Sequence, residues 1–335
     1  MNWNEYGAFI IEETKNLLAI DSPSGMTKKA AEHVAARFEA LGYAPQTTRK
    51  DGVLVCLGGR DRENGLLLEA HMDTLGGMVC QIKANGRLKI TPIGGLRAEN
   101  VETENCRVVT KFDGVIEGTA QLINASTHVN EKYADTQRTF DTVEIVLDEP
   151  VADAEDVKKL GVRTGDYVCF EPRTRVTKSG YIKSRFLDDK LSVGILLGYA
   201  KYLKDEQITP ERAVYVHITS FEEVGHGGSA SVPAGVTEAI SVDMGCVGEG
   251  LTCDERMVSI CAKDSGGPYN CDVVRGLIAA AEKMGAPYAV DVYPRYGSDV
   301  EATLRAGYDL RHGLIGSGVY ASHGYERSHI EGALA

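Results

Sequence analysis

The pattern that most limits the fold of this chain is a change of texture along its length. Both ends alternate helical spacing with short apolar strands, which is the order typical of an α/β sheet. Between about Met78 and Ser179 the pattern changes to short alternating strands separated by turns such as Asn85-Gly86, which is typical of β-hairpins. The change predicts an α/β domain of residues 1–76 and 180–335, interrupted by a small all-β domain of residues 77–179.

Charge and composition narrow the classes of partner. The formal net charge of −12 disfavours binding to a nucleic-acid backbone. No apolar run is long enough to span a bilayer, and the first residues lack the basic start and apolar core of a signal peptide. The cysteines form no Cys-x-x-Cys pair and mostly lie in apolar runs. We interpret them as small buried hydrophobic residues of a protein in a reducing compartment, not as metal ligands or disulfides. We therefore expect a cytoplasmic protein that binds neither nucleic acid nor membrane.

A pair of adjacent glutamates marks the strongest candidate site. Glu222 and Glu223 follow the apolar run 213–219, which we interpret as a buried strand. Two carboxylates at the end of such a strand are costly to desolvate unless they are paired or bound to a cation. One carboxylate can ligate a metal while its neighbour acts as a base on water. The glycine-rich segment 225–228 permits tight turns beside the pair.

Further candidates lie in similar positions. His71 follows an apolar strand, and Asp73, two residues later, could orient its imidazole ring. Asp188 precedes a helix, Asp243 ends an apolar run, and His323 follows a glycine-rich, strand-like segment. Each has a plainer interpretation when taken alone: a surface histidine, a helix N-cap or a turn aspartate. Their combination is the stronger signal.

Together these residues predict a metal centre. Open α/β sheets bind ligands outside the carboxyl ends of their strands, where the candidates are expected. Two histidines and three carboxylates could hold two divalent cations roughly 3.5–4 Å apart, with one carboxylate bridging them. The mixed nitrogen and oxygen donors favour zinc, cobalt or manganese over magnesium or calcium. His312 and His329 compete with His323, which we prefer because it follows directly on its strand.

In this order the residues resemble the M42 family of metallo-aminopeptidases, within the clan of co-catalytic zinc exopeptidases. The resemblance covers nearly the whole chain, and the insertion lies before Asp188, as in M42-like enzymes, whereas in M20-like peptidases it follows the Glu-Glu pair. The motifs that carry it are Ser22-Pro23-Ser24-Gly25, His71-Met72-Asp73, Leu187-Asp188-Asp189-Lys190, Glu222-Glu223-Val224-Gly225, Val242-Asp243-Met244, Gly297-Ser298-Asp299 and Tyr320-Ala321-Ser322-His323.

The resemblance implies a fold and an activity. The fold would be a three-layer α/β sandwich of the zinc-exopeptidase type (phosphorylase/hydrolase-like), with an inserted β-barrel or PDZ-like domain. The activity would be the removal of N-terminal residues from short peptides by a metal-bridging hydroxide, with two divalent ions per chain, zinc foremost. A homo-oligomer, from a dimer to a dodecamer, is also expected.

The resemblance also implies a role for each metal ligand. His71 and Asp243 would bind one cation, and Glu223 and His323 would bind the other. Asp188 would bridge the two cations.

Other residues would act on the substrate or support the ligands. Glu222 would be the general base and acid, and Asp73 would orient the imidazole of the first ligand. Asp299, Gly266 and Gly267 are candidates for the substrate pocket.

Departures from the family pattern concern the choice of substrate. Thr74 stands where many relatives have glutamate, Lys190 stands where arginine is common, and the ending 323–329 differs from the usual His-Ser-Pro-like ending. This ending resembles a subgroup linked with gene clusters for osmoprotectant dipeptides. Two alternatives therefore stay open: a deacylase or amidase that acts on a small modified dipeptide with the same site, and a non-catalytic binding or assembly module.

Overall fold

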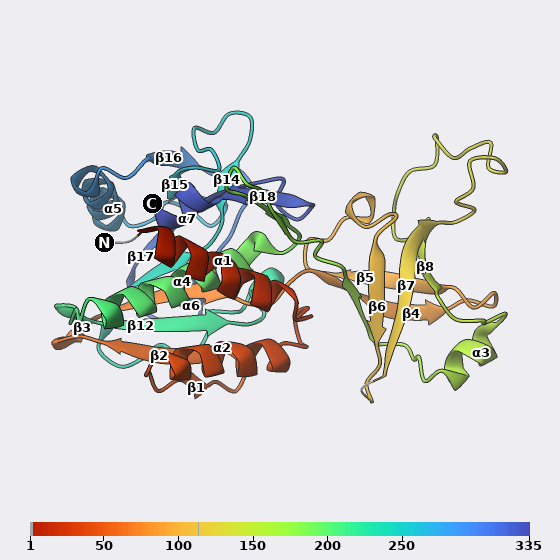
Figure 1. The fold of residues 1–335 in the computed structure, drawn as a ribbon, viewed down its shortest axis with the longest axis horizontal. Coiled ribbons are helices and arrows are strands. Elements are labelled where there is room, and N and C mark those ends of the chain that lie inside the picture. Colours follow the sequence, from red (N-terminus) through yellow and green to blue (C-terminus); the bar gives the residue numbers. More distant parts are fainter. Residues whose placement is uncertain (1–2, 113) are drawn as a thin grey trace. The chain divides into compact units, whose positions relative to one another are not determined.

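The computed structural model describes residues 3–112 and 114–335 (Figure 1). The chain forms two compact units, one of residues up to Thr74 together with Arg173–Ala335, and one of Leu75–Pro172. The inserted unit ends earlier than the expected 77–179. The reason is that strand β10 (Arg175–Val176) pairs with β11 (Tyr181–Ser184) in the sheet of the first unit.

The first unit is built on a mixed β-sheet. Its strand order is β1-β2-β12-β3-β13-β17-β18-β11-β10, with β14 and β15 also paired to β17 and β16 paired to β15. The neighbours β12, β3, β13 and β17 run parallel. Besides β10 and β11, the sheet contains β1 (Gln46–Thr47), β2 (Val53–Gly58), β3 (Asp61–His71), β12 (Arg212–Thr219), β13 (Val236–Val242), β14 (Gly245–Val247), β15 (Val258–Lys263), β16 (Tyr288–Val292), β17 (Arg311–Tyr320) and β18 (Glu326–His329).

Helices cover both faces of this sheet. They are α1 (Trp3–Leu18), α2 (Lys28–Ala40), α4 (Leu187–Asp205), α5 (Cys271–Met284), α6 (Asp299–Arg305) and α7 (Ile330–Leu334), with a short 3₁₀ turn η2 (Glu222–Val224). Successive side chains of a strand point to opposite faces. On β3, Leu68 packs in the cluster that holds Val34 of α2 and Leu196 of α4, whereas Leu67 packs with Val300 of α6. The unit is therefore a three-layer α/β sandwich, and the expected fold is confirmed.

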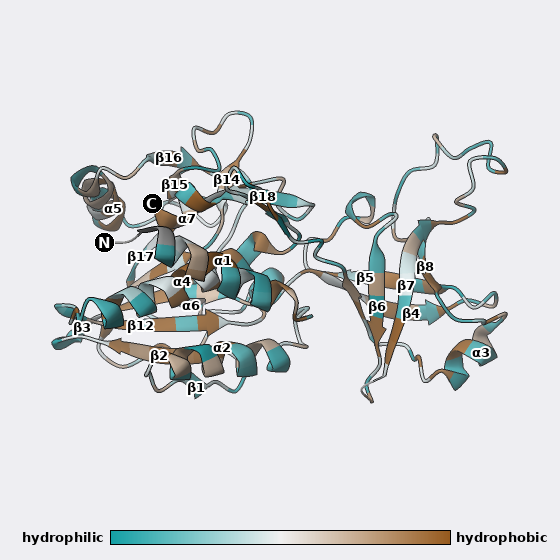
Figure 2. Ribbon diagram, in the orientation of Figure 1, coloured by the Kyte–Doolittle hydropathy of each residue, from teal (hydrophilic) through white to brown (hydrophobic). Residues whose placement is uncertain are grey.

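Hydropathy explains the layering. Strand β12 is buried along most of its length, and Figure 2 shows hydrophobic residues along it. Helix α2 contains both hydrophobic and hydrophilic residues. Its buried positions recur at helical spacing: Ala30, Ala31, Val34 and Phe38. Thr27 occupies the N-cap position of α2, although its side chain makes no capping hydrogen bond.

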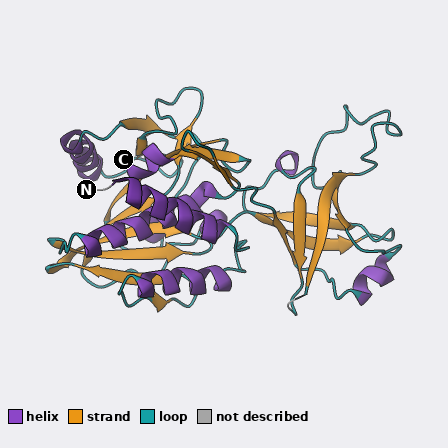
Figure 3. Ribbon diagram, in the orientation of Figure 1, coloured by secondary structure: helices purple, strands orange, loops and turns teal. Residues whose placement is uncertain are grey.

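The inserted unit is a closed antiparallel barrel, shown by its strands in Figure 3. The strand order around the barrel is β4-β5-β8-β7-β6-β9. Its elements are β4 (Gly76–Ile82), β5 (Leu88–Ile93), η1 (Ala98–Asn100), β6 (Asn105–Val109), β7 (Val115–Leu122), β8 (Val143–Leu147), α3 (Ala154–Lys159) and β9 (Tyr167–Phe170). Alternating buried positions such as Leu88, Ile90 and Val168 fill its interior. Closure removes the free sheet edges that a small β domain would otherwise expose.

The topology decides where function can lie. Parallel strands β3, β12, β13 and β17 end at one edge of the sheet, and Thr219 of β12 pairs with His71 of β3 in the ladder.

Among the helices of the described residues, none is long and apolar enough to cross a bilayer.

Candidate metal centre

The candidate residues gather where the parallel strands end. His71 is the last residue of β3, Asp243 follows β13, and His323 lies just beyond β17. Glu222 and Glu223 form the 3₁₀ turn after β12. The structure thus brings together side chains that are far apart in the sequence, at the carboxyl edge of an open α/β sheet.

His71 is fixed by contacts on both ring nitrogens. Its side chain is buried, and its Nδ1 lies 3.0 Å from the backbone oxygen of Asp73 and 3.5 Å from Oδ1 of the same residue. Its Nε2 lies 3.0 Å from Oδ1 of Asp188 and 3.6 Å from Oε2 of Glu222. The ring is thus oriented from behind by Asp73, so that Nε2 faces the carboxylates.

Asp188 lies between the two histidines. Its Oδ1 faces Nε2 of His71 at 3.0 Å, and its Oδ2 lies 3.5 Å from Nε2 of His323. The residue stands at the start of α4 with non-helical backbone angles and precedes a cis peptide bond to Asp189. A carboxylate with one oxygen toward each histidine has the arrangement of a bridging ligand.

The glutamate pair is held by Asp73. The backbone N–H groups of Glu222 and Glu223 donate to Oδ1 and Oδ2 of Asp73, at 3.2 and 3.4 Å, and the Ser24 hydroxyl donates to the same Oδ2. Oε2 of Glu223 lies 3.6 Å from Nε2 of His323. Buried Asp73 therefore positions both His71 and the turn that carries the pair.

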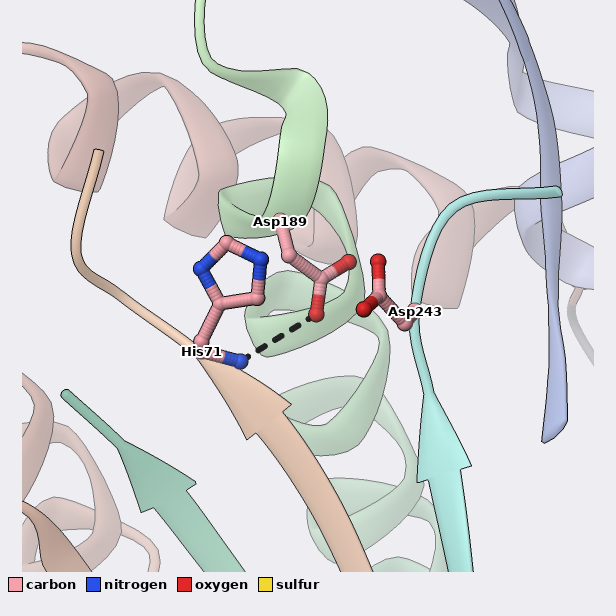
Figure 4. A group of neighbouring side chains, drawn as sticks. All are labelled: His71, Asp189 and Asp243. Carbon is pink, nitrogen blue, oxygen red and sulfur yellow. Dashed lines mark hydrogen bonds between the residues drawn. The ribbon is translucent and has the colours of Figure 1, made fainter. Parts of the chain in front are cut away.

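A second aspartate joins the cluster from the start of α4. Figure 4 shows the carboxylate of Asp189 between His71 and Asp243. Its Oδ2 accepts a hydrogen bond from the backbone N–H of His71 at 3.2 Å. Ligand atoms of His71, Asp189 and Asp243 lie within 4.8 Å of one another, and so do those of His71, Asp188 and Glu223. Two overlapping groups of ligands therefore share His71.

The electrostatics of the cluster reflect crowded, buried carboxylates. Burial, with Asp188 adding to it, raises the pKa of Asp243 to about 7. Burial also raises the pKa of Glu222 and Glu223 well above the usual range. Burial would raise the pKa of Asp188 too, but its hydrogen bonds to the two histidines outweigh burial and lower it. Carboxylates therefore outnumber their cationic partners within the cluster.

This chemistry fits divalent cations. Buried carboxylates are costly unless they are paired or coordinate a metal, and Oδ1 of Asp189 is buried and has no hydrogen-bond partner among the residues that the structure describes. The donors are imidazole nitrogens and carboxylate oxygens, a set that suits zinc, cobalt or manganese. The residues present therefore fit a centre for metal ions.

The three substrate-pocket candidates lie at the start of α6 and in the loop that follows β15. Asp299 is buried at the start of α6, where it accepts a hydrogen bond from the Gly228 N–H at 2.6 Å and another from the Thr219 hydroxyl. Gly266 packs against the carboxylate of Glu301, so a Cβ there would collide with it. Gly267 has a φ of +142°, which favours glycine. Their role toward a substrate stays a prediction.

Sequence reasoning missed two carboxylates of the cluster. Asp189 was visible in the doublet with Asp188, but spacing alone did not show which of the two faces the histidines. Glu326 gave no signal, because its contact with Asp188 depends on the pairing of β18 with β11. The competing histidines lie apart: His329 contacts the Ser179 carbonyl and His312 packs on Tyr269.

The chain is similar in sequence to known proteins along most of its length. The family model described as M42 glutamyl aminopeptidase matches residues 51–335. The candidate aminopeptidase YhfE of Bacillus subtilis (strain 168) is 41% identical over 319 residues, covering 95% of this chain and 92% of the relative.

Solved structures share the fold. The aminopeptidase APDkam598 from the archaeon Desulfurococcus kamchatkensis aligns with a TM-score of 0.87 and 21% identity, covering 98% of this chain and 92% of that one. The Pyrococcus horikoshii TET1 peptidase, which can assemble into a tetrahedron or a large octahedral shell, aligns with a TM-score of 0.84 and 23% identity, covering 97% and 96%.

Proposed function

Because this chain belongs to the M42 aminopeptidase family, we propose that it removes N-terminal residues from short peptides with the help of two divalent cations. The observation that carries the proposal is the position of Asp188, whose two oxygens face His71 and His323 separately. One bridging carboxylate between two histidine-containing groups is the ligand pattern of a two-metal hydrolytic site.

The ligands divide between the two cations as follows. His71 and Asp243 would hold one cation, Glu223 and His323 would hold the other, and Asp188 would bridge them. When bound, the cations supply a water of lowered pKa and polarise the scissile carbonyl.

Glu222 is the group that would accept and return the proton. Its Oε2 lies 3.6 Å from Nε2 of His71, and its backbone N–H donates a hydrogen bond to Asp73. The raised pKa of its buried carboxyl suits a group that accepts a proton from the attacking water and returns it to the leaving amine. Asp73 contacts both the imidazole ring of His71 and the backbone of Glu222, and so fixes their relative positions.

The assembly state extends the proposal. The Pyrococcus horikoshii TET1 peptidase, which shares this fold, can assemble into a tetrahedron or a large octahedral shell, and we infer that this chain also forms a homo-oligomer. Light scattering of the purified protein decides this, because a monomer would contradict the inference.

Metal analysis followed by a substrate panel tests the function. The purified protein is stripped, reloaded with zinc, cobalt or manganese, and assayed on aminoacyl-nitroanilides beside N-acylated amino acids. We expect two cations per chain and turnover of the free-amino substrates. Turnover of the acylated compounds alone would replace the aminopeptidase with a deacylase, and failure to bind two cations would overturn the site.

A further inference from the structure

A buried glutamate lies behind the candidate metal ligands. Glu326 is the first residue of β18, and only 2% of it is exposed. Its Oε2 accepts a hydrogen bond from the backbone N–H of Asp188 at 3.0 Å, and its Oε1 accepts one from the backbone N–H of His323 at 2.9 Å. One carboxylate therefore binds the main chain of two candidate ligands at once.

The two ligand-bearing segments leave neighbouring strands. Glu326 pairs with Ser184 in the antiparallel ladder of β18 and β11. From this pair the chain turns away on both sides through residues in the left-handed region: Phe186 has φ of +67°, Ala321 of +60° and His323 of +61°. Non-glycine residues hold this conformation only where their surroundings fix it. The Glu326 carboxylate supplies part of that fixation.

We propose that Glu326 is a positioning residue that sets the spacing between Asp188 and His323. The proposal rests on the two-metal function proposed above. It assigns Glu326 no contact with substrate or cation. Its effect passes through the backbone of the bridging carboxylate and of the histidine on the second cation, so its loss weakens binding of that cation first.

The geometry requires both oxygens of the carboxylate. Glutamine has nearly the same shape, but it offers one oxygen and one NH₂ group, so it can accept only one of the two bonds and turns a donor toward the other N–H. Aspartate keeps both oxygens but is shorter by one methylene group, so it cannot reach both N–H groups from the same backbone position. Glu326→Gln therefore separates a space-filling role from a positioning role, and Glu326→Asp tests the reach of the carboxylate.

Titration with Co²⁺ alone tests the proposal. Metal-free wild type, Glu326→Gln and Glu326→Asp are titrated by calorimetry, and the visible absorption of the bound Co²⁺ reports its coordination. We expect two Co²⁺ per wild-type chain. In both variants we expect the second Co²⁺ to bind about 10–100-fold more weakly, with an altered absorption spectrum. Circular dichroism of the metal-free proteins establishes that each variant is folded.

Glu13→Gln is the matched control. Glu13 is also buried, on α1 of the same unit, but its carboxylate pairs with Arg37, so this variant should bind Co²⁺ as the wild type does. Wild-type Co²⁺ affinity and spectrum in Glu326→Gln would overturn the proposal; if that variant does not fold, the same outcome in Glu326→Asp overturns it. A wild type that binds fewer than two Co²⁺ would overturn the proposed function, and the role of Glu326 with it.

Discussion

Glu222 and Glu223 are adjacent in the sequence but face different partners. Glu223 approaches His323, whereas Glu222 approaches His71. Because the two side chains of a 3₁₀ turn diverge, one can act as a ligand while the other stays free for proton transfer. The different partners make the two glutamates separable by mutation.

Glu222→Gln should leave the metals in place and abolish most activity. The amide cannot accept a proton from water, so we expect kcat to fall about 10²–10⁴-fold. Elemental analysis should still find two cations per chain, and the circular dichroism spectrum should be unchanged. Turnover close to that of the wild type would show that another group is the base.

Asp188→Asn should have the opposite signature. The proposed bridging ligand loses its charge and one of its two acceptor oxygens, so cation occupancy should fall together with activity. Elemental analysis after dialysis against metal-free buffer measures this. Full occupancy of the variant would contradict a bridging role.

Glu301 gives the chain a pH-dependent stability. Burial and a hydrogen bond to Asp264 raise the pKa of Glu301 to about 7, although Arg305 lies 3.3 Å away. The folded protein therefore binds more protons than the unfolded chain between about pH 4.5 and 7, so stability falls as the pH rises through this window. The cost is fully present above pH 7 and absent below pH 4.5.

Glu301→Gln should remove this dependence, because an amide can donate to Asp264 at every pH. Urea denaturation of both proteins at pH 5 and pH 8 measures the difference. We expect the variant to gain on the order of 1 kcal/mol over the wild type between these values, after screening by solvent. An equal change of stability in both proteins would refute the assignment.

At the scale of elements, the strands were the most predictable part. The short segments 53–57 and 258–263 are strands β2 and β15, because short runs that contain Val and Ile favour the extended conformation. Asp188 was expected to precede a helix, but α4 begins at Leu187 and so includes it, with Asp188 and Asp189 in non-helical conformations. Local propensity cannot predict that start, since tertiary contacts of the two aspartates decide it.

Gly316 of β17 packs tightly against the backbone of Asp243, so a small substitution there should lower the stability of the protein. A Cβ at Gly316 would collide with the backbone carbonyl of Asp243. Gly316→Ala should therefore destabilise the protein by about 1–3 kcal/mol and displace a candidate ligand. Guanidinium denaturation and elemental analysis check both effects.

Gly276→Ala is the control for that substitution. Gly276 is exposed in α5, and a Cβ there meets nothing within 4 Å. Alanine is favoured over glycine in a helix interior, so this variant should be more stable by about 0.5–1 kcal/mol. Equal effects of the two substitutions would show that the collision at Gly316 is relieved at little cost.

At the scale of the whole molecule, the cations should couple to folding. A ligand that binds only the folded chain stabilises it by about 2.7 kcal/mol at 100 times its dissociation constant. Removal of the metal by a chelator should lower the midpoint of urea denaturation, and added zinc should restore it. Asp188→Asn should respond less to the chelator, and equal midpoints of the wild type with and without metal would refute the coupling.

The sequence by itself determined the alternation of helices and strands, the insertion between His71 and Asp188, and the acidic and histidine side chains at strand ends. These follow from local periodicity and from the chemistry of side chains. Only the tertiary structure decided that Asp188 lies between two histidines, that Asp189 joins Asp243, and that Glu326 binds two backbone N–H groups. The contacts of Asp188 with His71 and with Glu326 join residues more than a hundred positions apart, and strand register and loop conformation, which no local pattern encodes, bring them together.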